Sequence, residues 1–497
     1  MFQKRFGQTS QSPDAWLDEL ADKVEIERLC SMGLLVHAEE FAGEICGKLT
    51  TKFVRDWRLK PYGADQTLSG MRRSRFVARE FAQEKRLDTF SPATGAHTAN
   101  VLLLQYLWLK DCAKQMQGQG DYIVVMGCLD VKDAFLMVDQ DQPILVHLHG
   151  QAFVIRKNLP GQRMGAKQWY QHLRDHLETA FGYTFCSEQP CLAKNSFSTL
   201  LIHVDDILYV GKQSYWEETF LKGMSEKFSV SHSKLEGEGS SITFLQRKIT
   251  DMGDWLMLTL GTSVEKVVKL FEDAFGTARK QKVPCDASIQ LQDDSEKLSA
   301  KDASAYRSVV GLCLHISRER PDLMFTIKEP ASSMSSPSLT SLQRLRKLVG
   351  YMRYVGDVGV RLHTPVPGQG KGCSGCDRSW VLETYSVADW SSNKSHRRST
   401  SSGIHLVNGA FMYGSSRGQK TISLSSCESE LHSLVSAACD GLFLMACLRF
   451  VLGEEILHLV YTDSSSARQL ASRQGCGRVR HISGKCCGSR RRPIQVS

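Results

Sequence analysis

Hydrophobic and polar positions alternate with two different periods along this chain, and together they predict a mixed α and β protein. Short apolar runs predict strands at 122–128, 144–149 and 199–204. Apolar residues at helical spacing predict helices at 169–181, 214–228 and 264–275. Gly182 directly follows the first of these helices and supplies a stop.

The last third of the chain repeats this mixture in a new order. Strands are predicted at 381–388, 403–407, 410–413 and 456–461, and helices at 430–452 and 464–471. Asn408 and Gly409 separate two of these strands, and this dipeptide tolerates the positive φ angles of a tight hairpin turn. A Gly-rich stretch, GQGKGCSGC at 368–376, is typical of a linker and predicts that a second unit follows it.

The length of the chain predicts the number of folding units, and its charge indicates the kind of partner. A chain of 497 residues with 42% hydrophobic content can bury sizeable cores, and its length predicts about three folding units. The formal net charge is +9, and the stretch 467–497 holds eight Lys or Arg and no Asp or Glu. This excess favours a polyanionic partner bound through its phosphates, although a solvated basic surface explains it equally well.

The sixteen cysteines follow no regular framework, which is typical of reduced thiols in an intracellular protein. Cys373 and Cys376 form one CxxC without a second pair, so we expect a loop with two free thiols rather than a metal knuckle. The N-terminus has no apolar core of signal-peptide length, and no run of about 18 uncharged apolar residues occurs. We therefore expect a soluble protein with no membrane partner.

Three acidic residues end or connect predicted strands, and we call them the first cluster. Asp130 follows the apolar run YIVVMGC, and Asp205 and Asp206 lie in IHVDDILYVG between two short strands. Adjacent acids repel each other, so a cation must offset them if the strands bring all three together. Carboxylate oxygens suit Mg²⁺, with Mn²⁺ as an alternative ion. An isolated Asp-Asp pair is more often only a solvated turn.

The surrounding motifs carry a family resemblance. LDVKDAFL at 129–136 and VDD at 204–206 resemble the two aspartate motifs of reverse transcriptases, about 75 residues apart. Three further motifs stand in the order found in copia-type LTR retrotransposon Pol polyproteins, which they resemble: RFVAREF, LPGQRMGAKQWY and YRSVVGLCLHISRERPD. They belong to ordered matches that run from about residue 50 to 482. The resemblance implies an α+β fold: a right-hand polymerase with fingers, palm and thumb, followed by a ribonuclease H-like α/β domain.

The resemblance also implies roles for particular residues. Asp130, Asp205 and Asp206 match the metal-binding catalytic acids, and Asp133 and Ala134 would lie against the incoming triphosphate. Phe135 matches the ring that excludes a ribose 2′-hydroxyl, although simple core packing is nearly as good an explanation. Contacts with template, nascent pair or phosphate are implied for Arg75, Gly161, Arg163 and Gly165. The chain departs from the family pattern at His203, Ala166 and Gln246, which indicates a diverged copy.

A second cluster consists of Asp389, Glu430 and Asp463, which stand at a strand end, a helix start and a strand end. The run 388–431 resembles the ribonuclease H region of copia-type elements, which implies Mg²⁺ and a water that cuts the RNA strand of a hybrid. Glu428 is the competing choice for the helix carboxylate. No Asp or Glu follows Asp463, so a fourth acid is missing and we expect impaired nuclease activity.

The segment after the second cluster adds little chemistry. His481, in RHIS, is a catalytic or phosphate-contacting candidate, but a helix-end histidine is at least as good an interpretation. The end of the chain lacks apolar periodicity for a final helix.

These observations predict six segments and one main activity. The segments are an N-terminal extension and start of the fingers (1–70), fingers and palm (71–250), thumb or connection (251–367), linker (368–380), ribonuclease H-like domain (381–485) and basic tail (486–497). The activity is RNA-directed DNA polymerase, with an RNA template, DNA primer, RNA/DNA hybrid and dNTPs as partners. Two alternatives are an inactive relic that only binds nucleic acid and a standalone nuclease.

Overall fold

A computed structural model describes residues 15–62, 67–80, 89–115, 123–287, 293–365, 380–394, 396–473 and 495–496. Cys373, Cys376, His481 and nearly all of the predicted linker and basic tail lie outside these residues. The chain divides into two compact units: unit 1 comprises Met1–Ala93 and Val131–Gly182, and unit 2 comprises Thr94–Asp130 and Tyr183–Ser497. The segment boundaries given above remain predictions.

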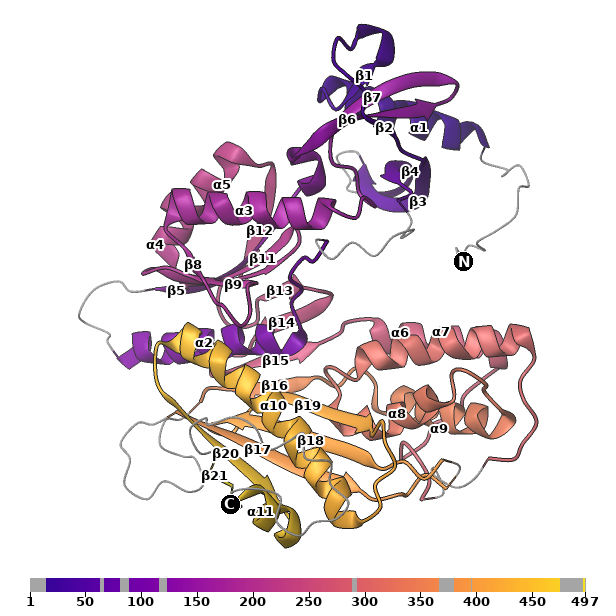
Figure 1. Cartoon of the computed structure of the whole chain (residues 1–497), viewed down its shortest axis with the longest axis vertical. Helices are drawn as coiled ribbons and strands as arrows, with labels where there is room; N and C mark the ends of the chain where they lie inside the picture. Colours follow the sequence, from indigo (N-terminus) through magenta and orange to yellow (C-terminus); the bar gives the residue numbers. More distant parts are fainter. Residues whose placement is uncertain are drawn as a thin grey trace. The chain divides into compact units, whose positions relative to one another are not determined.

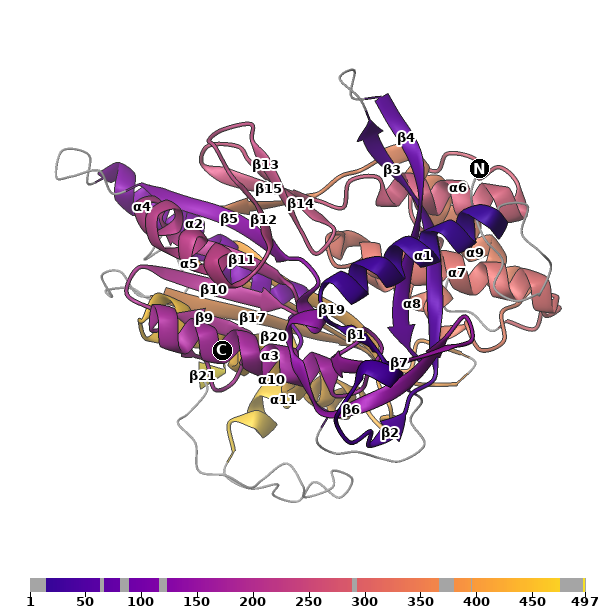
Figure 2. The same ribbon diagram turned by 90° about the horizontal axis from the view of Figure 1, so that it is seen from above.

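Unit 1 combines a helix, a long hairpin and a small sheet. The sheet has the order β1 (Leu35–His37), β7 (Gln151–Lys157), β6 (Asp139–Leu148) and β2 (Gly47–Lys48). Helix α1 (Ala15–Ser31) lies across the hairpin of β3 (Thr51–Tyr62) and β4 (Thr67–Ala78), as Figure 2 shows. Two ion pairs fasten the helix, Asp22 with Arg55 at 2.6 Å and Asp18 with Arg72 at 2.5 Å.

The predicted helix at 169–181 also belongs to unit 1. It is α3 (Gly165–Phe181), which begins four residues earlier than the apolar pattern indicated. Gly182 ends it in the left-handed conformation with φ 67°, so the predicted stop is confirmed. Trp169, Leu173 and Leu177 are fully buried on its apolar side.

Unit 2 begins with the sheet that carries the first cluster. Its strand order is β12 (Val230–Lys234), β5 (Val124–Val131), β11 (Asp206–Lys212), β10 (Ser198–His203), β9 (Leu192–Lys194) and β8 (Thr184–Phe185). The predicted helix at 214–228 consists of three consecutive helical segments: α4 (Gln213–Tyr215), a π-helical turn (Trp216–Phe220) and α5 (Leu221–Lys227). Gly127 leaves room for the Trp216 ring, because a Cβ there would lie 2.7 Å from Trp216 Cζ2.

A second sheet and a helical bundle follow in the chain. The sheet has the order β13 (Ser241–Phe244), β14 (Arg247–Asp251), β15 (Trp255–Thr259) and β16 (Val360–His363). The bundle consists of α6 (Ser263–Phe275), α7 (Ala300–Ile316), α8 (Met324–Ser332) and α9 (Leu339–Val355). Phe271, Tyr306 and Leu348 are among the side chains of its own buried core.

The predicted hairpin, strands and helices of the last third are confirmed, with small shifts in their bounds. The sheet has the order β19 (Ala410–Gly418), β18 (Thr400–Val407), β17 (Trp380–Asp389), β20 (Ile456–Thr462) and β21 (Gln495–Val496). Asn408 and Gly409 turn the hairpin with φ values of 47° and 84°. Helices α10 (Ser426–Leu452) and α11 (Ser465–Ala471) complete the unit.

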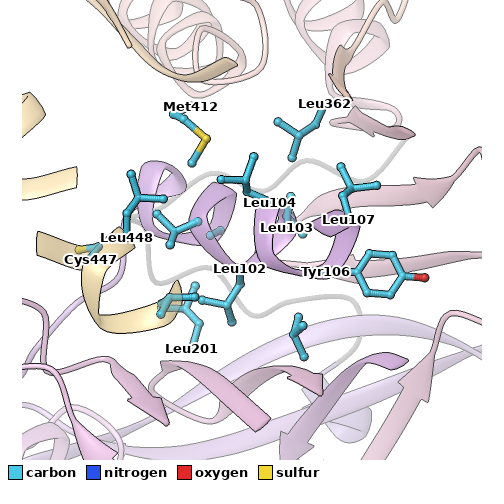
Figure 3. Close-up of a cluster of buried hydrophobic side chains, with 14 of the residues drawn as sticks. Leu102, Leu103, Leu104, Tyr106, Leu107, Leu201, Leu362, Met412, Cys447 and Leu448 are labelled. Atoms are coloured by element: carbon cyan, nitrogen blue, oxygen red, sulfur yellow. The ribbon is translucent and has the colours of Figure 1, made fainter. Parts of the chain in front are cut away.

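Helix α2 (Ala96–Gln115) lies between the sheet that carries the first cluster and the sheet of the last third of the chain. Its buried side chains belong to one hydrophobic core with residues of both. Figure 3 shows its side chains Leu102, Leu103 and Leu104 surrounded by residues of other elements. These neighbours are Leu201 of β10, Leu362 of β16, Met412 of β19 and Leu448 of α10. The region predicted as palm and the region predicted as nuclease therefore share one hydrophobic core.

Among the described residues, α10 is the one helix long and apolar enough, by length and composition, to cross a membrane. Leu434, Leu444, Leu448 and Val451 of this helix are buried inside the protein. Its apolar composition is therefore that of a core helix packed on the sheet.

Candidate active sites

The first cluster lies at one end of three neighbouring strands. Strand β10 pairs with β11, and β11 pairs with β5, both in antiparallel fashion. In this register Asp206 stands directly opposite Asp130, and His203 stands opposite Asp206 on the other side. Asp205 occupies the two-residue turn between β10 and β11. Asp130 and Asp206, 76 positions apart in sequence, are thereby brought to neighbouring backbone positions.

The turn itself has an unusual backbone. Val204, its first residue, has φ 58°, whereas Asp205 does not have a positive φ. This pattern suits glycine at the first position, and a β-branched residue there is strained. Strained backbone is concentrated at functional sites because the surrounding structure must hold it in place. The sequence patterns gave no sign of this strain.

Electrostatics at the first cluster disfavour three uncompensated charges. Burial, with the nearby charges of Asp205 and Asp130, raises the pKa of Asp206 to about 6. Burial is also the main cause that raises the pKa of Asp205, with a further increase from Asp130. No ion pair to any of the three acids forms within the described part of the chain, although Ser231 Oγ donates to Asp130 Oδ2 at 3.3 Å. A bound cation would relieve this repulsion.

The donor set suits a hard divalent ion, because all three side chains offer carboxylate oxygens. Across the described residues, no three His, Cys, Asp or Glu side chains are yet close enough together to hold a metal ion. Like charges turn away from each other when no counter-ion lies between them. We therefore expect the carboxylates to draw together only when a cation binds.

The second cluster lies where two parallel strands end. Asp389 is the last residue of β17, and Asp463 directly follows β20, its parallel neighbour. Glu430, near the start of α10, accepts a hydrogen bond from the backbone N–H of Ala388 at 3.0 Å. Burial raises the pKa of Glu430, and the charge of Asp463 raises it further. These three acids therefore stand at one edge of the sheet.

Glu428, the competing choice, is engaged by the start of the helix. Its Oε2 accepts from the backbone N–H of Leu424 at 2.7 Å, while its own N–H donates to the N-cap residue Ser425. This arrangement explains why α10 begins four residues before the predicted start at Glu430. It also leaves Glu430 as the helix carboxylate nearer the strand ends.

No family model matches the chain. Among curated proteins it is 25% identical to the retrovirus-related Pol polyprotein from transposon RE1 of Arabidopsis thaliana, over 85% of this chain and 28% of that protein. The corresponding polyprotein of transposon TNT 1-94 from Nicotiana tabacum is 23% identical over 82% of this chain and 30% of its own length. The chain's homologues are Pol polyproteins of copia-type retrotransposons. The chain spans less than a third of the length of these Pol relatives.

A solved structure supports the same fold. The foamy viral protease-reverse transcriptase in complex with dsDNA matches 95% of this Pol-like chain and 78% of its own, with a TM-score of 0.51 and 14% identity. At this identity the likeness shows the fold alone. The predicted fold class, an α+β right-hand polymerase followed by a ribonuclease H-like domain, is confirmed.

The remaining residues implied by the Pol resemblance lie in unit 1, and Asp133 has a partner that sequence analysis missed. Asp133 adopts φ 54° at the start of a 3-10 turn (Ala134–Met137), and its Oδ2 accepts from Arg28 Nη1 at 2.7 Å. Arg28 also pairs with Glu25. An arginine about a hundred residues away has no sequence pattern that would connect it to Asp133.

Two glycines of the Pol motif at 159–170 are explained by close packing. Gly161 has φ 97°, and a Cβ there would lie 2.5 Å from the carbonyl oxygen of Ala78. A Cβ on Gly165 would lie 3.2 Å from the ring of Phe135. Phe135 is half-buried against the start of α3, and Ala134 is buried. These contacts hold the motif against β4 and against the turn that carries Phe135.

The two arginines implied by the resemblance occupy different surroundings. The backbone N–H of Arg163 donates to Glu80 Oε2 at 3.0 Å. Arg75 lies on β4, half-exposed, with Asp56 at 3.9 Å. The pKa of neighbouring Arg73 is lowered by burial and by the charges of Arg58 and Arg75, which indicates a concentration of positive charge on this hairpin. Such a surface suits phosphate groups.

Proposed function

We propose that this chain is the reverse transcriptase and ribonuclease H part of a retrotransposon Pol polyprotein. The observation that carries the proposal is the strand register that places Asp206 opposite Asp130, with Asp205 in the adjoining strained turn. The homology to Pol polyproteins and the shared fold support it. In this proposal the chain copies RNA into DNA, and its partners are an RNA template, a DNA primer and dNTPs.

In the proposed reaction Asp130, Asp205 and Asp206 would hold two Mg²⁺ ions. When bound, such ions lower the pKa of a primer hydroxyl and neutralise charge on the leaving group. The primer 3′-hydroxyl gives its proton to water, and its oxygen forms a bond to the α-phosphorus of a dNTP. The bond from that phosphorus to the oxygen bridging to the β-phosphate breaks, releasing pyrophosphate. Positioning and charge supply the catalysis, without a covalent enzyme intermediate.

Residues of unit 1 would handle the substrates. Phe135 would exclude a ribose 2′-hydroxyl, Asp133 and Ala134 would lie against the triphosphate, and Arg75, Gly161, Arg163 and Gly165 would contact nucleic acid. The ion pair between Arg28 and Asp133 supports a positioning role for Asp133, since it orients that side chain before any substrate arrives.

Primer extension tests the polymerase. We expect poly(rA) primed with oligo(dT) to be extended with Mg²⁺ or Mn²⁺, and Asp206→Asn to lower the rate about a hundredfold or more. Asp254→Asn is a matched control, because this carboxylate is exposed and belongs to neither cluster. Absence of incorporation by the unaltered protein, with retained binding of primed template, would instead support the inactive relic.

The second cluster supports a weaker, ribonuclease H-like activity. Asp389, Glu430 and Asp463 would hold Mg²⁺ near an RNA/DNA hybrid, but the segment RHIS at 480–483 has Ser483 where the resemblance implies a fourth acid. We expect slow cleavage of the RNA strand that Glu430→Gln abolishes and Glu428→Gln preserves. Equal loss in both variants would contradict this assignment, and cleavage without any extension would support a standalone nuclease.

A further inference from the structure

A cavity of about 450 Å³ lies within unit 2, and none of the six acids of the two clusters lines it. We call it the junction pocket, because three separate parts of the chain form its walls. These are the start of α2 with the residues before it, the facing parts of α7 and α8 with their connection, and strand β19. Its volume is that of a site for a small organic ligand.

The charged side chains that line the junction pocket are all basic: Arg318, Lys328 and Arg417. Arg417 pairs with Asp440 at 3.2 Å, and Lys328 pairs with Glu329 and donates to Thr400. Arg318 is exposed and forms no ion pair with any carboxylate of the described residues. The pocket therefore favours a ligand with an anionic group, and Arg318 is the cation available to bind it.

Two rings form an aromatic wall. His97 and Tyr413 meet edge to face, with ring centroids 5.3 Å apart. Gly95 permits this placement, because a Cβ on Gly95 would lie 2.5 Å from His97 Cε1. Burial lowers the pKa of His97, so the imidazole is neutral near pH 7 and offers a ring rather than a charge. Such a wall suits a planar ligand group.

One buried acceptor in the pocket wall lacks a partner. Asn100 is only 4% exposed, and its Nδ2 donates to the carbonyl oxygen of Met412 at 2.7 Å. Its Oδ1 is buried and accepts no hydrogen bond from any described residue. A buried oxygen without a donor is unfavourable, and this one exposes less than 1 Å² of surface. A ligand N–H in the pocket would satisfy it once the Asn100 side chain rotates toward the cavity.

We propose that the junction pocket binds a nucleoside monophosphate: a planar base whose N–H donates to Asn100 Oδ1, with its phosphate on Arg318. A planar ring, a hydrogen-bond donor and an anionic group on one small molecule match the three features of the walls. The site uses no residue of either cluster and needs no divalent ion. It is therefore independent of the polymerase proposed above.

Calorimetric titration of the full chain in EDTA tests the pocket, with AMP, adenosine and ribose 5-phosphate as separate probes. We expect AMP to bind, and Arg318→Ala to weaken AMP at least tenfold while leaving adenosine unchanged. Asn100→Leu should weaken AMP and adenosine but not ribose 5-phosphate. Lys301→Ala is the matched control, since it removes a cation from α7, the helix that ends two residues before Arg318, and Lys301 does not line the pocket.

Arg318 is exposed, so Arg318→Ala should fold normally. This variant tests the proposal even if Asn100→Leu fails to fold. Absence of AMP binding at millimolar concentration, or binding that Arg318→Ala leaves unchanged, overturns the proposal. Asp206→Asn should bind AMP as the unaltered protein does. Loss of AMP binding in that variant would place the nucleotide at the first cluster and would also overturn the proposal.

Discussion

At the scale of single residues, burial of acidic side chains, together with repulsion between them, is the feature that most distinguishes the first cluster. Asp206 is half-buried, stands opposite Asp130 and follows Asp205, and its pKa rises to about 6. The fold thus places these acidic residues at neighbouring backbone positions, where burial and the charges of Asp205 and Asp130 act on Asp206. An arrangement that opposes folding is retained when a ligand makes it useful, and in the function proposed above that ligand is a divalent ion.

Replacing Asp206 should therefore stabilise the metal-free protein at neutral pH. The folded pKa of about 6 lies above the unfolded value of about 3.9, so the unfavourable charge exists above pH 6 and disappears as pH falls below 4. Allowing for solvent screening, Asp206→Asn should raise the free energy of unfolding by about 1 kcal/mol at pH 7.5 and little at pH 4. Urea denaturation in EDTA at both pH values measures this, and equal effects at the two values would contradict it.

The acids of both clusters could be predicted because they belong to ordered motifs, and their strand positions follow from apolar runs. Contacts that depend on distant segments could not be predicted from the sequence. The pair of Arg28 with Asp133 and the unsatisfied Oδ1 of Asn100 depend on contacts between distant segments. The positive φ of Val204 was equally hidden, because sequence rules expect glycine at such a position.

At the scale of elements, α10 and the sheet beneath it enclose a polar network. Thr384 Oγ1 lies 2.9 Å from His405 Nδ1 and 2.9 Å from His458 Nε2. Burial is the main cause that lowers the pKa of each histidine to about 4. Apolar periodicity predicted the strands that carry these residues. It could not predict that a hydroxyl and two imidazoles fill the space between them.

The threonine hydroxyl should be essential to this network. Thr384→Val leaves two buried ring nitrogens without a partner, so we expect a loss of about 2 kcal/mol, whereas Thr384→Ser keeps the hydroxyl and most of the stability. In the unaltered protein the neutral histidines stabilise the fold above pH 6.5, and this contribution declines as pH falls toward 4. Urea denaturation from pH 7.5 to 4 measures both effects, and equal losses in the two variants would contradict the role of the hydroxyl.

Two helical glycines offer a matched comparison. A Cβ on Gly441 of α10 would lie 2.4 Å from His458 Nε2, whereas a Cβ on Gly311 of α7 meets no other atom within 4 Å. Gly441→Ala should therefore destabilise the protein by about 1–3 kcal/mol through overpacking. Gly311→Ala should stabilise it by about 0.5–1 kcal/mol through helix propensity. Thermal unfolding compares them, and the same sign for both would refute the packing argument.

At the scale of the whole molecule, α2 joins regions that sequence analysis treated as separate. The Gly-rich stretch predicted that a second unit begins after it, and the apolar residues of α2 are buried against strands and helices from both regions of unit 2. Trp108 of α2 also meets Trp380 of β17 edge to face, with ring centroids 5.6 Å apart. Apolar pattern shows that a helix is buried but not which partners bury it.

Because the two regions of unit 2 share one hydrophobic core, a substitution in that core should destabilise both of them. Leu448 of α10 is fully buried beside α2, so Leu448→Ala should cost about 2–5 kcal/mol. Hydrogen exchange should then speed up in β10 and β11 as well as in β17 and β20. Leu345→Ala in the separate core of the helical bundle is the control and should affect that bundle most. Faster exchange confined to β17 and β20 in Leu448→Ala would show that the regions unfold independently.

The sequence of the DNA product tests the central claim most directly. An RNA template of mixed sequence with an annealed DNA primer, all four dNTPs and Mg²⁺ should yield DNA complementary to that template. Asp206→Asn should abolish this product and Asp463→Asn should leave it. No extension, or extension whose sequence ignores the template, would contradict the assignment of the first cluster as an RNA-directed polymerase site.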